Sequence, residues 1–179
     1  NNLAAFYYAQ GKYGEAEPLY RRALAIREKA LGAGHLEVAI SLNNLAALFY
    51  AQGQGAAAEP LYRRALAVRE KALGPAHPEV LQSITNLGAL YYGQGKFAQA
   101  EPLYRRLLAL KEKALGPAHP EVAAGLSNLA RLYGDQGKYA EAEPLYRRYL
   151  AIREKTLGPD DPELAADLQV MATFTYAQG

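Results

Sequence analysis

The chain repeats itself at a fixed interval of 42 residues, and this periodicity constrains its fold more than any other feature. The segment AEPLYRR occurs four times, beginning at Ala16, Ala58, Ala100 and Ala142. The repeats occupy residues 11–52, 53–94, 95–136 and 137–178 without insertion or deletion, and residues 1–10 resemble the end of a preceding repeat. Because each repeat can bury its apolar faces only against its neighbours, residues 1–179 are expected to form one domain. The incomplete first repeat suggests a fragment of a longer protein.

The first helix of each repeat, called the B helix, is predicted by an apolar stripe that recurs about every 3.6 residues. In the second repeat this stripe consists of Ala58, Leu61, Tyr62, Ala65, Leu66 and Val68. A glycine follows each B helix, and Gly74 is expected to cap the helix in a left-handed conformation.

The second helix of each repeat, called the A helix, begins after the sequence LGPAHPEV. Pro78 suits the first helical position, and Glu79 suits the positive end of the helix dipole. This helix is predicted from about Pro78 to Tyr92, and Gly95 turns the chain back. Because both connections are short, successive helices should be antiparallel. The chain is therefore expected to be all-α with about nine helices, from residues 1–9 to about residues 162–177.

Composition limits the classes of partner. The formal charge is +2, and basic and acidic residues are interleaved, which argues against nucleic acid or an anionic membrane as a partner. The absence of cysteine excludes disulfides and thiolate metal sites. No apolar run approaches the roughly 20 residues of a membrane span. These features predict a soluble, cytoplasmic protein.

The pattern of small and large residues within a repeat resembles the tetratricopeptide repeat (TPR). The residues that match the TPR pattern, in one A helix and the B helix that follows it, are Leu45, Ala46, Phe49, Ala58, Tyr62 and Ala65. The 42-residue period and the phrase EAEPLYRRALAIREKALG are similar to the subclass found in kinesin light chains and many bacterial scaffold proteins. The resemblance implies an α-solenoid, wound as a right-handed superhelix, whose A helices line a concave groove that binds protein partners.

One asparagine recurs nine residues before the turn glycine of each A helix, although asparagine is a poor helix former. The four are Asn2, Asn44, Asn86 and Asn128. The resemblance implies that they point into the groove, where a carboxamide can donate to and accept from a peptide backbone. The alternative is that they hydrogen-bond between neighbouring A helices and only fix the stacking.

The remaining residues of the expected site lie near these asparagines and would choose partner side chains. The complete set is Asn2, Asn43, Asn44, Tyr50, Gln82, Thr85, Asn86, Tyr92, Ser127, Asn128, Arg131 and Asp135. The sequence is equally consistent with two roles for Tyr8, Tyr50 and Tyr92, either lining the groove or packing between helices. The last A helix has Val170 at the asparagine position, so the ladder ends there.

One cluster breaks the repeat. Arg131, Gly134 and Asp135 stand where an earlier A helix has alanine, tyrosine and alanine. Because deviations from a scaffold's own pattern often mark function, this cluster is a candidate for partner selectivity, with a charged segment as the ligand.

A carboxylate clamp is not expected. In the arrays that bind a C-terminal carboxylate, lysine or arginine stands one turn before the groove asparagine. The corresponding residues here are Ile40, Gln82, Ala124 and Ala166.

Other recurring polar residues have structural interpretations. His35, His77 and His119 occur once per repeat, and the last repeat has Asp161 there, which favours helix capping over metal binding. The two arginines that end each AEPLYRR segment could form a phosphate-binding surface. A glutamate four residues before the first arginine of each pair favours an ion-paired outer face instead. Tyr20, Tyr62, Tyr104 and Tyr146 are predicted to be core residues.

No catalytic, cofactor or metal motif is present, so no enzymatic activity is expected. The predicted function is a scaffold that binds an extended peptide or a partner helix. One alternative is a structural module that self-associates head to tail, helped by Met171, Phe174 and Tyr176 in the last helix. Another is the recognition domain of a larger enzyme or signalling protein.

Overall fold

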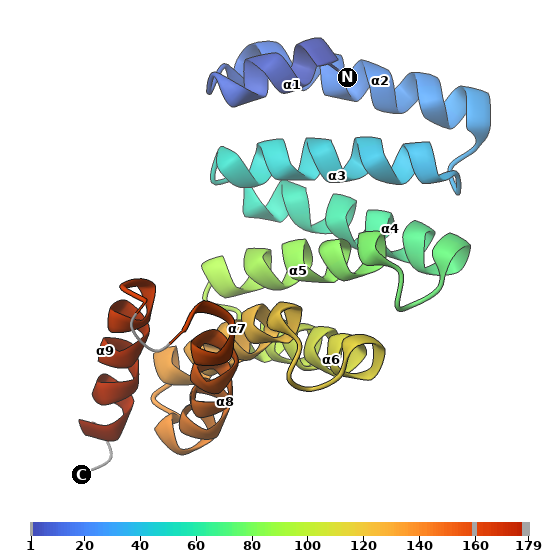
Figure 1. Ribbon diagram of the computed structural model, residues 1–179. Helices are drawn as coiled ribbons and strands as arrows, with labels where there is room; N and C mark the ends of the chain where they lie inside the picture. The colour runs from blue at the N-terminus through green and yellow to red at the C-terminus, as the bar shows by residue number, and fades with distance from the viewer. Residues whose placement is uncertain (1, 159–160, 177–179) are drawn as a thin grey trace. The chain divides into compact units, whose positions relative to one another are not determined.

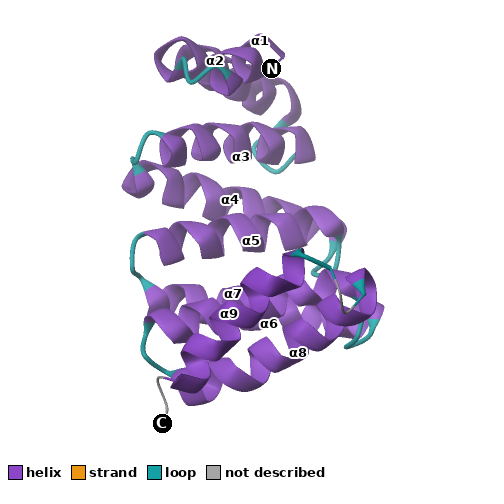
Figure 2. Ribbon diagram, turned by 60° about the vertical axis from the view of Figure 1, so that its left-hand side comes forward, coloured by secondary structure: helices purple, strands orange, loops and turns teal. Residues whose placement is uncertain are grey.

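The computed structural model describes residues 2–158 and 161–176, with side chains described through residue 172. Within these residues the structure is all-α and contains no strand (Figures 1 and 2). The helices are α1 (Asn2–Ala9), α2 (Tyr13–Leu31), α3 (Leu36–Ala51), α4 (Gly55–Leu73), α5 (Pro78–Gly93), α6 (Phe97–Leu115), α7 (Pro120–Asp135), α8 (Tyr139–Leu157) and α9 (Glu163–Tyr176). The odd-numbered helices are the A helices, and the even-numbered ones are the B helices. The prediction of nine helices is confirmed for the part of the chain that is described.

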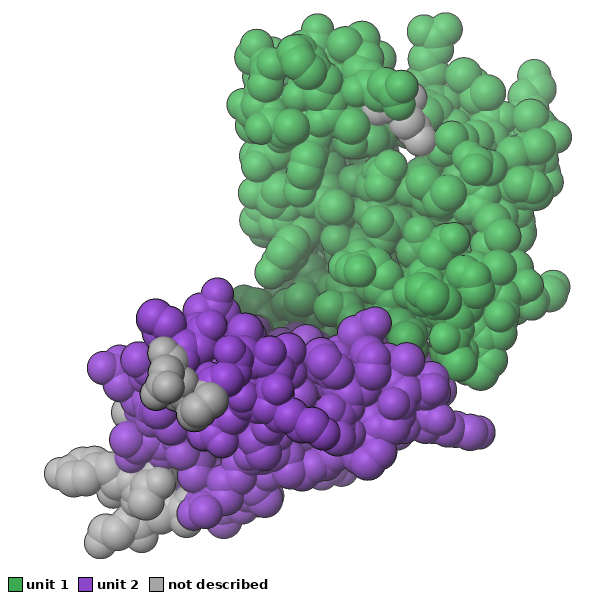
Figure 3. All heavy atoms as spheres, in the orientation of Figure 1, with its two compact units in different colours: residues 1–94 green, residues 95–179 purple. Residues whose placement is uncertain are grey.

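The helices form two compact units, residues 1–94 and residues 95–179, which are coloured separately in Figure 3. In the first unit each of α1 to α4 packs on the next helix of the chain, and in the second unit each of α6 to α8 does the same. The expectation of one domain over residues 1–179 stays a prediction, and each unit is described below by itself.

The core of the first unit lies between an A helix and the B helices on either side of it. Val38, Ala39 and Leu42 of α3 and Ala65 of α4 are fully buried. Leu24, Leu61 and Val68 pack around them. The four B-helix tyrosines that were predicted to be core residues are 2–5% exposed, so that prediction is confirmed.

The glycine after each B helix differs in one respect from the expectation. Gly74 has φ 80° and ψ 164°, so its φ is positive as predicted but its ψ is extended instead of left-handed helical. Its N–H still donates to the carbonyl of Glu70 at 3.0 Å. The extended ψ sends the chain away from the helix and into the loop before α5. This backbone region is essentially restricted to glycine.

The recurring histidines cap the A helices, as predicted. Nδ1 of His35, His77 and His119 accepts a hydrogen bond from the backbone N–H two residues later, at 3.2, 3.3 and 3.2 Å. Oδ1 of Asp161 accepts the same bond from Glu163 at 2.8 Å. Each side chain therefore satisfies a backbone donor that the first turn of a helix leaves unpaired.

The predicted ion-paired outer face is also confirmed. The first arginine of each pair contacts the glutamate four residues earlier, at 2.8 Å for Arg21, 3.6 Å for Arg63, 2.9 Å for Arg105 and 2.6 Å for Arg147. These four side chains are 57–66% exposed. Water screens such pairs, so each contributes at most about 1 kcal/mol.

A second set of polar contacts, which the sequence analysis missed, links each B helix to the A helix that follows. Arg69 of α4 donates to Oγ of Ser83 at 2.7 Å, and its Nε lies 3.3 Å from the carboxylate of Glu79 on α5. Burial lowers the pKa of Arg69, and the nearby Glu79 opposes this effect. The corresponding cations are Arg27, Lys111 and Arg153, which pair with Glu37, Glu121 and Glu163.

Candidate functional site

Three of the predicted site residues form one polar network in the first unit. Nδ2 of Asn86 on α5 donates to Oδ1 of Asn43 on α3 at 2.8 Å. Nε2 of Gln82 donates to Oδ1 of Asn86, also at 2.8 Å. Asn86 thus makes the contact between neighbouring A helices that was the alternative to peptide binding. A carboxamide has two donor hydrogens and two acceptor lone pairs, so Asn86 keeps one of each for a further partner.

The other asparagines of the predicted ladder behave differently. Asn44 on α3 and Asn128 on α7 are half-buried, and Asn2 on α1 is exposed. In the described part of the chain, the side chains of Asn44 and Asn128 form no hydrogen bond. Neither side chain has a fully buried atom without a hydrogen bond, so both amides are accessible to groups from outside the chain.

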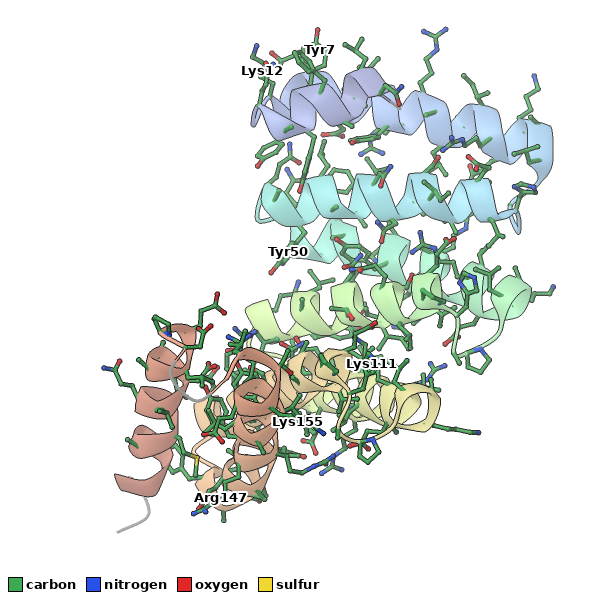
Figure 4. All side chains as sticks on the ribbon, viewed as in Figure 1. Tyr7, Lys12, Tyr50, Lys111, Arg147 and Lys155 are labelled. Carbon is green, nitrogen blue, oxygen red and sulfur yellow. The ribbon has the colours of Figure 1, made fainter. Side chains whose placement is uncertain are left out.

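The remaining predicted residues of the first unit differ from one another in their contacts and their exposure. The hydroxyl of Thr85 donates to the carbonyl of Leu81 in its own helix, at 2.9 Å. Tyr50 is 44% exposed, whereas Tyr92 is half-buried. Figure 4 shows the Tyr50 side chain extending from the C-terminal end of α3 toward the C-terminal end of α5. A methyl group built at Gly93 would lie 3.1 Å from the Tyr50 hydroxyl.

The second unit brings the remaining predicted residues, apart from Asn128, to one pocket. The pocket has a volume of about 500 Å³ and lies between α7, α8 and α9. Its described lining residues are Ser127, Arg131, Gly134, Asp135, Tyr139, Tyr146 and Val170. This volume is within the range of small-molecule sites, roughly 300–1,000 Å³. The repeat-breaking cluster therefore surrounds a cavity.

Sequence reasoning identified three of the polar lining residues but missed the aromatic ones. Tyr146 was assigned only to the core, and it is indeed 5% exposed. Burial raises its pKa, and the carboxylate of Asp167 adds to this effect. Tyr139 was not considered. The signal that could have identified it is its place five residues after Gly134, where the first B helix has Tyr13 five residues after Tyr8.

Among the described residues, no three His, Cys, Asp or Glu side chains lie where they could hold a metal ion together. The described helices include none that is long and apolar enough to cross a membrane.

Antiparallel helix pairs of constant length, with caps and core residues in constant register, define the chain as a helical repeat protein. A sequence model of the tetratricopeptide repeat matches residues 1–71, 42–113, 79–155 and 121–179. The chain therefore belongs to the tetratricopeptide repeat family, and its fold class is the α-solenoid of helix-turn-helix repeats, as predicted. None of the curated proteins compared with the chain matches it.

Two solved structures are similar over nearly the whole chain. The nearly identical TPR-like repeats described for a kinesin light chain of Podosopora anserina are 31% identical, with a TM-score of 0.86, covering 99% of this chain and 84% of that one. BtubC (BKLC) from P. vanneervenii is 26% identical, with a TM-score of 0.84, covering 99% and 70% of the two chains. The predicted resemblance to kinesin light chain repeats is therefore confirmed. Proteins with this repeat generally serve as protein-interaction scaffolds.

Proposed function

We propose that the chain binds an extended peptide segment of a partner protein along the asparagine-bearing face of its A helices. Side-chain amides hold the peptide backbone, and neighbouring side chains select its sequence. An extended segment suits this face because its backbone N–H and C=O groups are unpaired, and a carboxamide complements both.

The observation that carries this proposal is the pair of half-buried carboxamides without hydrogen bonds, at Asn44 and Asn128. Their positions are equivalent in two repeats, one in each unit. The amide atoms of both side chains are not among the fully buried atoms without a hydrogen bond, so they remain accessible, and each bond to a peptide backbone can contribute about 0.5–1.5 kcal/mol. Hydrogen bonds fix the orientation of the Asn43, Gln82 and Asn86 side chains, which reduces the entropy that these three lose on binding.

The test begins with a random peptide library displayed on phage and selected against the intact chain. The dissociation constant of a selected peptide is then measured by calorimetry for the chain and for the double variant Asn44→Ala, Asn128→Ala. At about 0.5–1.5 kcal/mol for each hydrogen bond, the double variant should bind roughly tenfold more weakly or worse.

The matched control carries two alanine substitutions on the ion-paired outer face, Arg63→Ala and Arg147→Ala, which should leave the dissociation constant within about twofold. The proposal is wrong if the asparagine variant binds the selected peptides as tightly as the unmodified chain does. It is also wrong if selection recovers no specific peptide.

A second candidate function is self-association, which exposed apolar residues favour. Leu3 and Phe6 of α1 are 55% and 58% exposed, and Leu168 of α9 is 49% exposed. The side chains of Phe174 and Tyr176, which were expected to contribute, lie outside the described residues. Light scattering across protein concentration tests this candidate. A molecular mass that rises with concentration supports self-association, and a constant monomer mass contradicts it.

A further inference from the structure

The first A helix places a tyrosine ring against a tyrosine of the following B helix. Tyr8 of α1 packs against Tyr13 of α2, with the ring centroids 5.6 Å apart. Burial raises the pKa of the α2 residue Tyr20, and the phenol of Tyr8 adds to this effect.

The second A helix has Tyr50 at the position of Tyr8, although Gly55 stands at the position of Tyr13. Burial raises the pKa of Tyr62 to about 12, with smaller contributions from the phenols of Tyr8 and Tyr50. The Tyr50 hydroxyl reaches the next A helix, since a methyl group at Gly93 would lie 3.1 Å from it. The tyrosine at this position therefore fills space beside the following A helix.

The second unit retains the surroundings of this ring but not the ring. Tyr139 and Tyr146 of α8 occupy the positions of Tyr13 and Tyr20, three repeats later. The position of Tyr8 is taken by Gly134. The pocket of about 500 Å³ opens at this place, lined by Gly134, Tyr139, Tyr146 and, from the next A helix, Val170. The pocket therefore opens at the position where the first repeat has a tyrosine side chain.

The polar residues at the pocket suit a phenol ring supplied by another molecule. Arg131 and Asp135 both line the pocket, and both also interact with other groups of the chain. A guanidinium can lie over an aromatic face, and a carboxylate can accept a hydrogen bond from a phenolic hydroxyl. The earlier A helices have alanine at the position of Arg131, and alanine or glycine at that of Asp135.

The geometry points to an anchor site in which the pocket at Gly134 binds a tyrosine side chain of the partner peptide, in place of the ring that this repeat lacks. This inference rests on the proposed function, because it assigns one side chain of the same peptide. Aromatic pairs gain about 0.5–1.5 kcal/mol beyond the area they bury. A tyrosine ring should therefore bind about tenfold more tightly than an aliphatic side chain of similar size.

The test is a titration of the isotopically labelled chain with N-acetyl-tyrosinamide, followed by the backbone amide signals in nuclear magnetic resonance spectra. We expect saturable shifts at Gly134 and Tyr139, and about tenfold weaker binding of N-acetyl-leucinamide. Absence of saturable shifts, or equal binding of the two probes, overturns the inference.

Two variants and one control locate the site. Gly134→Tyr fills the pocket with the residue of the earlier A helices and should abolish binding of the probe. Tyr139→Leu removes one aromatic wall and should weaken binding about tenfold. Gly14→Tyr is the control, because nothing lies within 4 Å of a methyl group built at this helical glycine. Unchanged probe binding by the first two variants overturns the anchor site.

The outcome separates this inference from the proposed function. Library peptides that need Asn44 and Asn128 but lack any preference for tyrosine would overturn the anchor site alone. Loss of the asparagine effect would overturn the proposed function, whatever the pocket binds.

Discussion

The capping residue before an A helix owes its role to a single hydrogen-bond acceptor atom in its side chain. Histidine and aspartate differ in size and charge, yet both accept a hydrogen bond from the N–H two residues later. The position selects for an acceptor at a fixed distance from the backbone, which explains why Asp161 can replace histidine. Helix capping was predictable from the sequence, because the residue that replaces histidine, aspartate, is a preferred helix cap.

The cap at His77 should contribute measurably to stability. His77→Ala removes the acceptor of the Glu79 N–H and should lower the free energy of unfolding by about 1 kcal/mol. His77→Asp supplies the acceptor of the last repeat and should restore most of that loss. Urea unfolding followed by circular dichroism measures both. Equal stability of the alanine and aspartate variants would contradict the capping role.

Buried tyrosines should make the first unit sensitive to alkaline pH. The pKa of Tyr62 is raised to about 12 in the folded chain, chiefly by burial, against about 10 when unfolded. Above pH 10 the unfolded chain loses this proton first, so stability falls as pH rises from about 10 to 12. The contribution of Tyr62 to this loss is about 1 kcal/mol at pH 11.

Tyr62→Phe removes the titrating hydroxyl and keeps the ring. Urea unfolding at pH 8 and pH 11 should therefore show a smaller alkaline loss for this variant, by about 1 kcal/mol. An identical loss in the two proteins would show that the Tyr62 hydroxyl does not titrate differently in the folded state.

For the individual helices, the residues at which they begin and end follow from nearby proline and glycine residues. Which side chains pair between helices depends instead on how the helices pack against each other. Proline and glycine positions predicted α5 as residues 78–92, one residue short of its observed end. The partner of Asn86 is Asn43, not the equivalent Asn44, because the two A helices meet with an offset that no single repeat encodes. Arg69 and Ser83 lie 14 residues apart on different helices, so neither suggests the other in the sequence.

The contacts between Arg69 and α5 should stabilise that helix pair more than their counterparts stabilise α2 and α3. Ser83→Ala removes an acceptor from Arg69, whose side chain is only 8% exposed, and should cost about 1–2 kcal/mol. Ser41→Ala removes the same acceptor from Arg27, which is 26% exposed and can bind water instead. Thermal unfolding should therefore show a larger decrease in the melting temperature for Ser83→Ala than for Ser41→Ala. Equal decreases in the melting temperature would contradict the role of burial.

For the whole molecule, the repeat predicted the family and the fold class. The sequence also identified Arg131, Gly134 and Asp135 as a break in the repeat, but it could not show the structural consequence of Gly134. Its consequence, a pocket, depends on Tyr139 and Tyr146 keeping their places around the empty position. The sequence likewise could not show that, within the described residues, Asn86 has two hydrogen-bond partners while Asn44 and Asn128 have none, because that depends on side-chain packing between helices.

The central claim is that the asparagine-bearing faces of the A helices bind an extended peptide. Its most direct test is a map of backbone amide shifts over the whole chain when a library-selected peptide is titrated to saturation. The account predicts that shifts concentrate on α3, α5 and α7, around Asn44, Asn86 and Asn128, and that the B-helix residues around Arg63 do not respond. Saturable shifts confined to the B helices, with the three asparagines unaffected, would contradict it.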